Sequence, residues 1–145
     1  MNTIKSLFLL CLFLMILIYP NNGFSQTTIE NIRSQPYLKD KHKVNCDSAE
    51  TTAALRICAN LQFQESDSIL NITYQKILKE IDTGNINISR LNFISSQEKW
   101  IGYRDKHCNL YWEMYEGGSL QSIVYLNCLT YFSNERRGEL LKFLD

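Results

Sequence analysis

Four cysteines are the feature that most constrains the fold of this chain. A fifth, Cys11, lies in an N-terminal apolar segment that we expect to be removed, which leaves Cys46, Cys58, Cys108 and Cys128. An even number of cysteines in an exported chain indicates disulfides. There is no CxxC pair, and separations of 12, 50 and 20 positions do not fit a zinc site. The sequence therefore predicts two structural disulfides, no metal site and no other cofactor.

The N-terminus has the layout of a secretory signal peptide. Lys5 precedes an apolar run over residues 7–19, and the small residues Gly23 and Ser25 follow it. The run is shorter than the roughly 20 residues that span a membrane. We expect a signal peptide over residues 1–25 and a periplasmic or secreted protein with no membrane span after cleavage. An uncleaved anchor is the alternative.

The mature chain would be long enough for one domain. Residues 26–45 are polar, contain Pro36 and lack periodicity, so we expect a mobile leader before a helical domain over residues 46–145. Removal of the signal peptide leaves 14 basic against 15 acidic residues. This balance argues against a nucleic-acid partner, which usually requires a basic surface.

Helical periodicity dominates the mature chain. Apolar residues recur with a 3.6-residue period from about Thr51 to Ile81, and Gly84 interrupts the pattern. Ser89 is a candidate N-cap for a second helix over residues 90–116. The two stripes are Ala59, Phe63, Leu70, Tyr74, Ile77 and Ile81 on the first helix, and Ile94, Gln97, Ile101, Arg104, Cys108, Tyr111 and Tyr115 on the second.

A glycine pair separates the second helix from a third. Gly117–Gly118 is expected to end the second helix, and Ser119 to cap the next one. In the segment FSNER, Ser133 is expected to cap a last short helix. We therefore predict an all-α fold, a small disulfide-stapled bundle of three to four helices. The apolar face of the third helix would consist of Leu120, Val124, Cys128 and Tyr131.

The glycine pair also bears on the disulfide pairing. Cys108 lies 9 residues before Gly117 and Cys128 lies 10 after Gly118, so antiparallel arms would bring them level. Cys46 would then pair with Cys58. A continuous helix would separate these two by about 18 Å, so Cys46 must lie in a non-helical segment that folds back. The second and third helices would then form a helical hairpin around the glycine pair. The alternative pairs Cys46 with a cysteine of this hairpin.

Arg104 stands in an otherwise largely apolar stripe. A buried guanidinium requires a carboxylate partner, and we expect Asp67 of the first helix to supply it. Asp105 points about 100° away around the helix and is a worse candidate. With Asn71 and Gln97, these residues predict a structural polar network. An active site of Asp67, Arg104 and Tyr74 is the alternative. No nucleophile–base pair supports catalysis, so we predict no catalytic residues and no enzyme activity.

The segment YWEMY is dense in aromatic residues. It either packs in the core or forms an exposed patch that binds a protein. The candidate partner-binding residues are Tyr111, Trp112, Glu113, Tyr115, Glu116 and Ser119.

Several of these segments occur together in one known family. The chain resembles the lysozyme inhibitor LprI-like family over roughly residues 46–141, a bacterial exported domain. The resemblance rests on the ordered cysteines and on SDSILNITY, QEKWIGYRDKHC, GGS and CLTYFSNERRGEL. It implies an all-helical, disulfide-bonded exported domain and, in some members, inhibition of lysozyme that protects the cell wall. The alternative function is an envelope interaction or stress protein with a non-lysozyme partner.

Overall fold

The computed structural model describes residues 44–145. The expected signal peptide and nearly all of the expected leader lie outside these residues. The described part begins with a short 3-10 turn, η2 (Cys46–Ser48), and continues with α3 (Thr52–Asp82), α4 (Arg90–Met114) and α5 (Gln121–Leu141). No strand occurs within residues 44–145. The predicted all-α fold is confirmed, with three α-helices in the described part of the chain.

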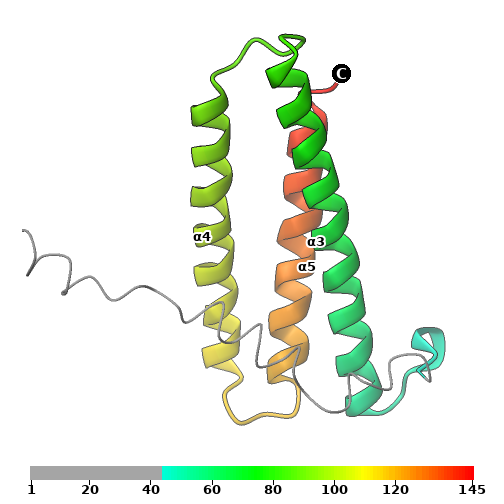
Figure 1. Ribbon diagram of the computed structural model, residues 1–145. Coiled ribbons are helices and arrows are strands. Elements are labelled where there is room, and N and C mark those ends of the chain that lie inside the picture. Colours follow the sequence, from blue (N-terminus) through cyan, green and yellow to red (C-terminus); the bar gives the residue numbers. More distant parts are fainter. Residues whose placement is uncertain (1–43) are drawn as a thin grey trace, which may run out of the picture.

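The last helix is the centre of the bundle. α5 packs along α3 for most of its length and also contacts α4, whereas α3 and α4 contact each other at few points. Figure 1 shows α3 and α5 side by side, with α4 standing off to one side. The α3–α4 turn and the C-terminus lie at one end of the molecule, and the α4–α5 turn lies at the other.

Capping explains where two of the helices begin. The Thr51 hydroxyl accepts a hydrogen bond from the Ala54 amide, and the Ser89 hydroxyl accepts one from the Asn92 amide, so the predicted Ser89 cap is confirmed. The expected Ser119 cap is wrong. Leu120 holds the N-cap position of α5 without a side-chain cap, and the backbone oxygen of Ser119 instead accepts from Arg56.

The predicted break at Ser133 is also wrong, because α5 runs on to Leu141. Ser133 is fully buried and its hydroxyl accepts a hydrogen bond from Arg104. The predicted apolar face of this helix was rotated from the real one, since Tyr131 is 60% exposed and Leu120 is also exposed. The face that is buried consists of Ser122, Tyr125, Leu126, Leu129, Ser133 and Leu140.

Two apolar cores lie at opposite ends of the bundle. The hairpin-end core surrounds Cys108 and contains Ala59, Phe63, Tyr125, Leu126 and Leu129. The distal core lies toward the α3–α4 turn and contains Leu70, Ile77, Leu78, Phe93 and Leu140. The predicted first-helix stripe contributes to both cores. On α4, Phe93 is buried and Trp100 half-buried, while Ile101, Tyr111 and Tyr115 of the predicted stripe are exposed.

Both predicted disulfides are confirmed. Cys46 bonds to Cys58 and Cys108 bonds to Cys128, each with 5.6 Å between Cα atoms. The first bridge can form because η2 folds back along the start of α3. A continuous helix from Cys46 to Cys58 would hold the two cysteines too far apart. The second joins α4 to α5 inside the hairpin-end core, where Cys108 is completely buried.

Removing the bridges should destabilise the fold unequally. We expect Cys108→Ala with Cys128→Ala to lower the free energy of unfolding by about 4 kcal/mol, and Cys46→Ala with Cys58→Ala by about 2–3 kcal/mol. The hairpin bridge closes the longer loop and its loss also opens a cavity at Cys108. Urea unfolding followed by circular dichroism measures both values. Equal losses, or a larger loss for the Cys46–Cys58 pair, would contradict this ranking.

Candidate functional site

A polar layer separates the two cores, with Arg104 of α4 at its centre. Its side chain is only 7% exposed. Nη1 lies 3.1 Å from Oδ1 of Asp67 on α3 and 3.3 Å from the Ser133 hydroxyl on α5. Nε and Nη2 each lie 2.9 Å from Oδ1 of Asp105. The guanidinium therefore joins all three helices, and two carboxylates offset its buried charge.

A second arginine extends the polar layer along α5. Nε of Arg136 donates to the Gln97 side-chain oxygen at 3.0 Å, and Nη1 pairs with Glu139. The indole ring of Trp100 contacts both cations, with its centroid 5.1 Å from the guanidinium carbon of Arg104 and 5.8 Å from that of Arg136. The polar layer is thus two cationic centres joined through one aromatic ring.

The structure brings together most of the predicted network and adds to it. Asp67 contacts Arg104 as expected, and Asn71 donates to the other Asp67 oxygen at 3.3 Å. Gln97 belongs to the Arg136 centre and not directly to Arg104. The low rank given to Asp105 is wrong: a long arginine side chain can bend back to its neighbour's carboxylate, although the two Cβ atoms diverge.

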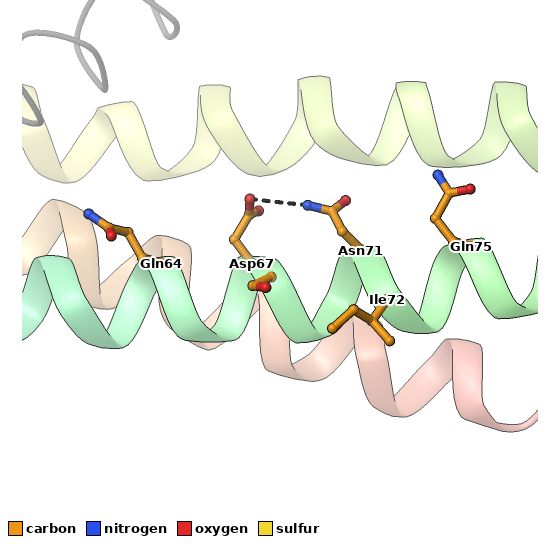
Figure 2. A pocket seen from close by; sticks show the side chains of 6 residues that line it. Gln64, Asp67, Asn71, Ile72 and Gln75 are labelled. Atoms are coloured by element: carbon orange, nitrogen blue, oxygen red, sulfur yellow. Dashed lines mark hydrogen bonds between the residues drawn. The ribbon is translucent and has the colours of Figure 1, made fainter.

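The polar layer borders a hollow on the surface of α3, which we call the α3–α4 crevice because its polar side chains point toward α4 (Figure 2). The crevice has a volume of about 550 Å³ and is lined from α3. Figure 2 shows Gln64, Asp67, Asn71 and Gln75 in a row on the side of α3 that faces α4, with a hydrogen bond between Asp67 and Asn71. This row is polar, and its one carboxylate is already bonded to Arg104. The arrangement suits a solvated structural contact between helices.

Tyr74 does not join Arg104. Its ring stacks on Phe93 at 5.2 Å in the distal core. Desolvation raises the pKa of the Tyr74 phenol above its ordinary value of 10.0, an effect that Arg90 opposes and Glu98 reinforces. The predicted alternative of an active site with Asp67, Arg104 and Tyr74 therefore lacks a common location.

The hairpin end carries a second hollow, which we call the α4–α5 groove. It has a volume of about 350 Å³. Its walls are mainly aromatic, and the Cys128 end of the hairpin disulfide also lines it. The residues that define the groove here are His107, Tyr111 and Tyr115 from α4 and its C-terminal cap, and Asn127, Tyr131 and Phe132 from α5.

The candidate partner-binding residues divide by their burial. Tyr111 and Tyr115 are exposed and line the α4–α5 groove. Trp112 is half-buried and packs edge-on against Tyr125 in the hairpin-end core, so its ring is largely structural. The other three candidates, Glu113, Glu116 and Ser119, are exposed at the hairpin tip.

Sequence reasoning missed the α5 half of both sites. Ser133 and Arg136 belong to the polar layer, and Asn127, Tyr131 and Phe132 belong to the groove. The spacing of Leu129, Ser133, Arg136 and Leu140, in steps of 4, 3 and 4, could have indicated an unbroken helix face.

The class of protein is a small helical bundle with two disulfides and a polar layer between two cores. Within residues 44–145, no helix has the length and apolar character needed to cross a membrane, and no three metal-binding side chains cluster. The chain matches the family described as lysozyme inhibitor LprI over residues 44–140, which include both disulfides and all of α5 except its last residue. It belongs to that family.

Other comparisons give less about function. An uncharacterized protein of Rhizobium meliloti (strain 1021) is 27% identical over 110 residues, which span 70% of this chain and 79% of that protein. No solved structure matches.

Substitution of Arg104 should cost far more stability than substitution of an exposed arginine. We expect Arg104→Met to lower the free energy of unfolding by about 3 kcal/mol, because Asp67 and Asp105 are only 28% and 13% exposed and lose their cation. The matched control is Arg90→Met. It breaks the Arg90–Asp82 pair, both of whose side chains are 51% exposed, and should cost less than about 1 kcal/mol. Similar losses in urea unfolding would contradict a central role for Arg104.

The raised pKa of Tyr74 gives a dependence on alkaline pH. The folded state favours the neutral phenol, so this contribution to stability is complete below pH 10.0 and is lost as the pH rises through the folded-state pKa. We expect Tyr74→Phe to flatten the fall in melting temperature above pH 10.0, with Tyr131→Phe as the exposed control. Parallel curves for Tyr74→Phe and the wild type would contradict the shift.

Proposed function

We propose that this protein is an exported binding module that inhibits lysozyme and has no catalytic activity of its own. The observation that carries the proposal is its membership of the lysozyme inhibitor LprI family over nearly the whole described bundle. The two disulfides are consistent with an oxidising compartment outside the cytoplasm. The proposed signal peptide over residues 1–25 would deliver the chain there.

The polar layer supports a binding role better than a catalytic one. Each nitrogen of the Arg104 guanidinium lies within 3.3 Å of an acceptor in the protein, and Ser133 is fully buried with its hydroxyl receiving one of those bonds. The Ser133 hydroxyl faces a guanidinium, which stays protonated and cannot act as the general base that a serine nucleophile requires. We therefore assign the polar layer to holding the helices in place.

A rigid bundle suits inhibition because little conformational freedom is lost on binding. The Cys108–Cys128 bridge joins α4 to α5 just before the C-terminal end of α4, where Tyr111, Tyr115 and Glu116 follow. A surface held in its bound shape loses less entropy on association and binds more tightly. The exposed aromatic rings at this end are of the type that carries binding energy in protein interfaces.

A lysozyme turnover assay tests the proposal. The oxidised mature protein, added in excess, should slow cell-wall lysis by at least one of the c-, g- and i-type lysozymes, in proportion to its concentration. The same chain, reduced and alkylated at its cysteines, should have no effect, because its bundle is destabilised. Unchanged rates with all three enzymes would remove the proposal, and a stable non-lysozyme partner on co-purification would replace it.

Inhibition by Arg104→Met separates a structural polar layer from a functional one. Below its melting temperature this variant should inhibit as well as the wild type, because Arg104 is buried away from the hairpin surface. Loss of inhibition in a fully folded variant would give Arg104 a direct functional role.

A further inference from the structure

The net charge of the described bundle is concentrated at the hairpin end. Residues 44–145 contain 13 acidic and 10 basic side chains, not counting histidine. Residues 107–132, which line the groove and form the hairpin tip, contain Glu113 and Glu116 but no lysine or arginine, so this segment holds two of the three excess negative charges. Arg56 of α3 is the cation that reaches this hairpin, and its Nη2 is bonded to the backbone oxygen of Ser119.

The aromatic rings beside these carboxylates form one connected surface. His107 lies 5.7 Å from Tyr103, 6.0 Å from Tyr111 and 4.9 Å from Phe132 between ring centroids. Phe132 in turn contacts Tyr131 edge-on at 5.5 Å. The three tyrosines are exposed, which is unusual for so many connected rings on a soluble domain and marks an interaction surface.

The composition of the α4–α5 groove indicates the charge of its occupant. No lysine, arginine or carboxylate lines it, so its walls offer ring faces, phenol groups and the Asn127 amide. Glu135 follows Tyr131 by one helical turn, and Glu116 follows Tyr115 at the tip. Aromatic walls with carboxylates at their margins suit a lysine or arginine side chain, whose stem packs on the rings while its charged head meets a ring face or a carboxylate.

We propose that the α4–α5 groove is the docking surface for a basic protein, which inserts a lysine or arginine side chain between Tyr111 and Tyr131. The inference deepens the proposed function and rests on it for the identity of that protein as a lysozyme. The carboxylates at the tip would attract the basic partner, and the rings would hold it. The α3–α4 crevice would remain outside the interface.

Two sets of variants test the surface, with binding to c-type lysozyme measured by calorimetry and inhibition measured in the turnover assay. Tyr111→Ala and Tyr131→Ala should each raise the dissociation constant by about ten-fold or more. Their controls, Ile72→Ala and Leu91→Ala, remove apolar side chains elsewhere that are more exposed than either tyrosine, and should change the dissociation constant by less than about two-fold. Circular dichroism confirms that each variant is folded.

The second set of variants tests whether binding depends on the carboxylates near the groove or only on the net charge of the protein. The triple variant Glu113→Gln, Glu116→Gln and Glu135→Gln should weaken binding about ten-fold and reduce its dependence on salt. The control triple, Glu65→Gln, Glu80→Gln and Glu98→Gln, changes the net charge by the same amount outside the hairpin and should leave binding close to that of the wild type.

A probe that does not depend on inhibition distinguishes failure of the function from failure of the surface. A hexa-arginine peptide titrated into the labelled protein should give saturable NMR shifts at Tyr111, Asn127 and Tyr131, with none at Asn71 or Gln75 of the crevice. If lysozyme is not inhibited but these shifts appear, the proposed function fails and the basic-partner surface stands.

Three results would overturn the inference. The first is a lysozyme that is inhibited equally by the wild type and by both groove variants. The second is an absence of saturable shifts at the groove with both the peptide and lysozyme. The third is a different occupant: self-association that Tyr131→Ala abolishes in sedimentation, or tight binding of an N-acetylglucosamine oligomer at Tyr111 and Tyr131.

Discussion

A guanidinium in the middle of a helical bundle must be neutralised without solvent, and the arrangement of this bundle follows from how Arg104 meets that requirement. Its acceptors come from α3, α4 and α5 together, so no two helices alone would satisfy it. Sliding one helix past another would leave a buried charge facing apolar side chains, at a cost of several kcal/mol. The apolar cores on either side supply the bulk of the burial, and the polar layer determines how the helices align.

Much of the fold could be predicted from the sequence, and the main failure lies in one helix. The disulfide pairs, the all-α class and the extents of the first two helices follow from cysteine spacing and apolar periodicity. On α5, the serines at positions 122 and 133 interrupt the apolar pattern. This interruption led to a wrong prediction of the buried face and of a helix break at Ser133. A small polar residue can be buried when a partner across the interface uses it, as Arg104 uses Ser133, and that partner is not visible in the local sequence.

The partner-binding surface could also be predicted only in part from the sequence, because its α5 half depends on how the helices pack. The aromatic residues of α4 stand close together in the sequence, so their concentration is evident without a structure. Their neighbours on α5 became part of the same surface only because the hairpin aligns His107 with Phe132. Conversely, Trp112 belongs to the same sequence cluster but turns inward toward Tyr125. Periodicity indicates which residues share a helix face, while the packing of a second helix decides which rings remain exposed.

Both disulfides lie at one end of the bundle, so the opposite end should unfold first. Cys46–Cys58 lies at the hairpin end (Figure 1) and Cys108–Cys128 lies inside the hairpin-end core, whereas the distal core is closed only by side-chain contacts and contains the last turns of α5. Local opening takes the least stable unit first. Backbone amides around Ile77, Phe93 and Leu140 should therefore exchange with solvent through partial openings that leave the hairpin intact. A protein with this property keeps its hairpin surface formed even when its other end frays.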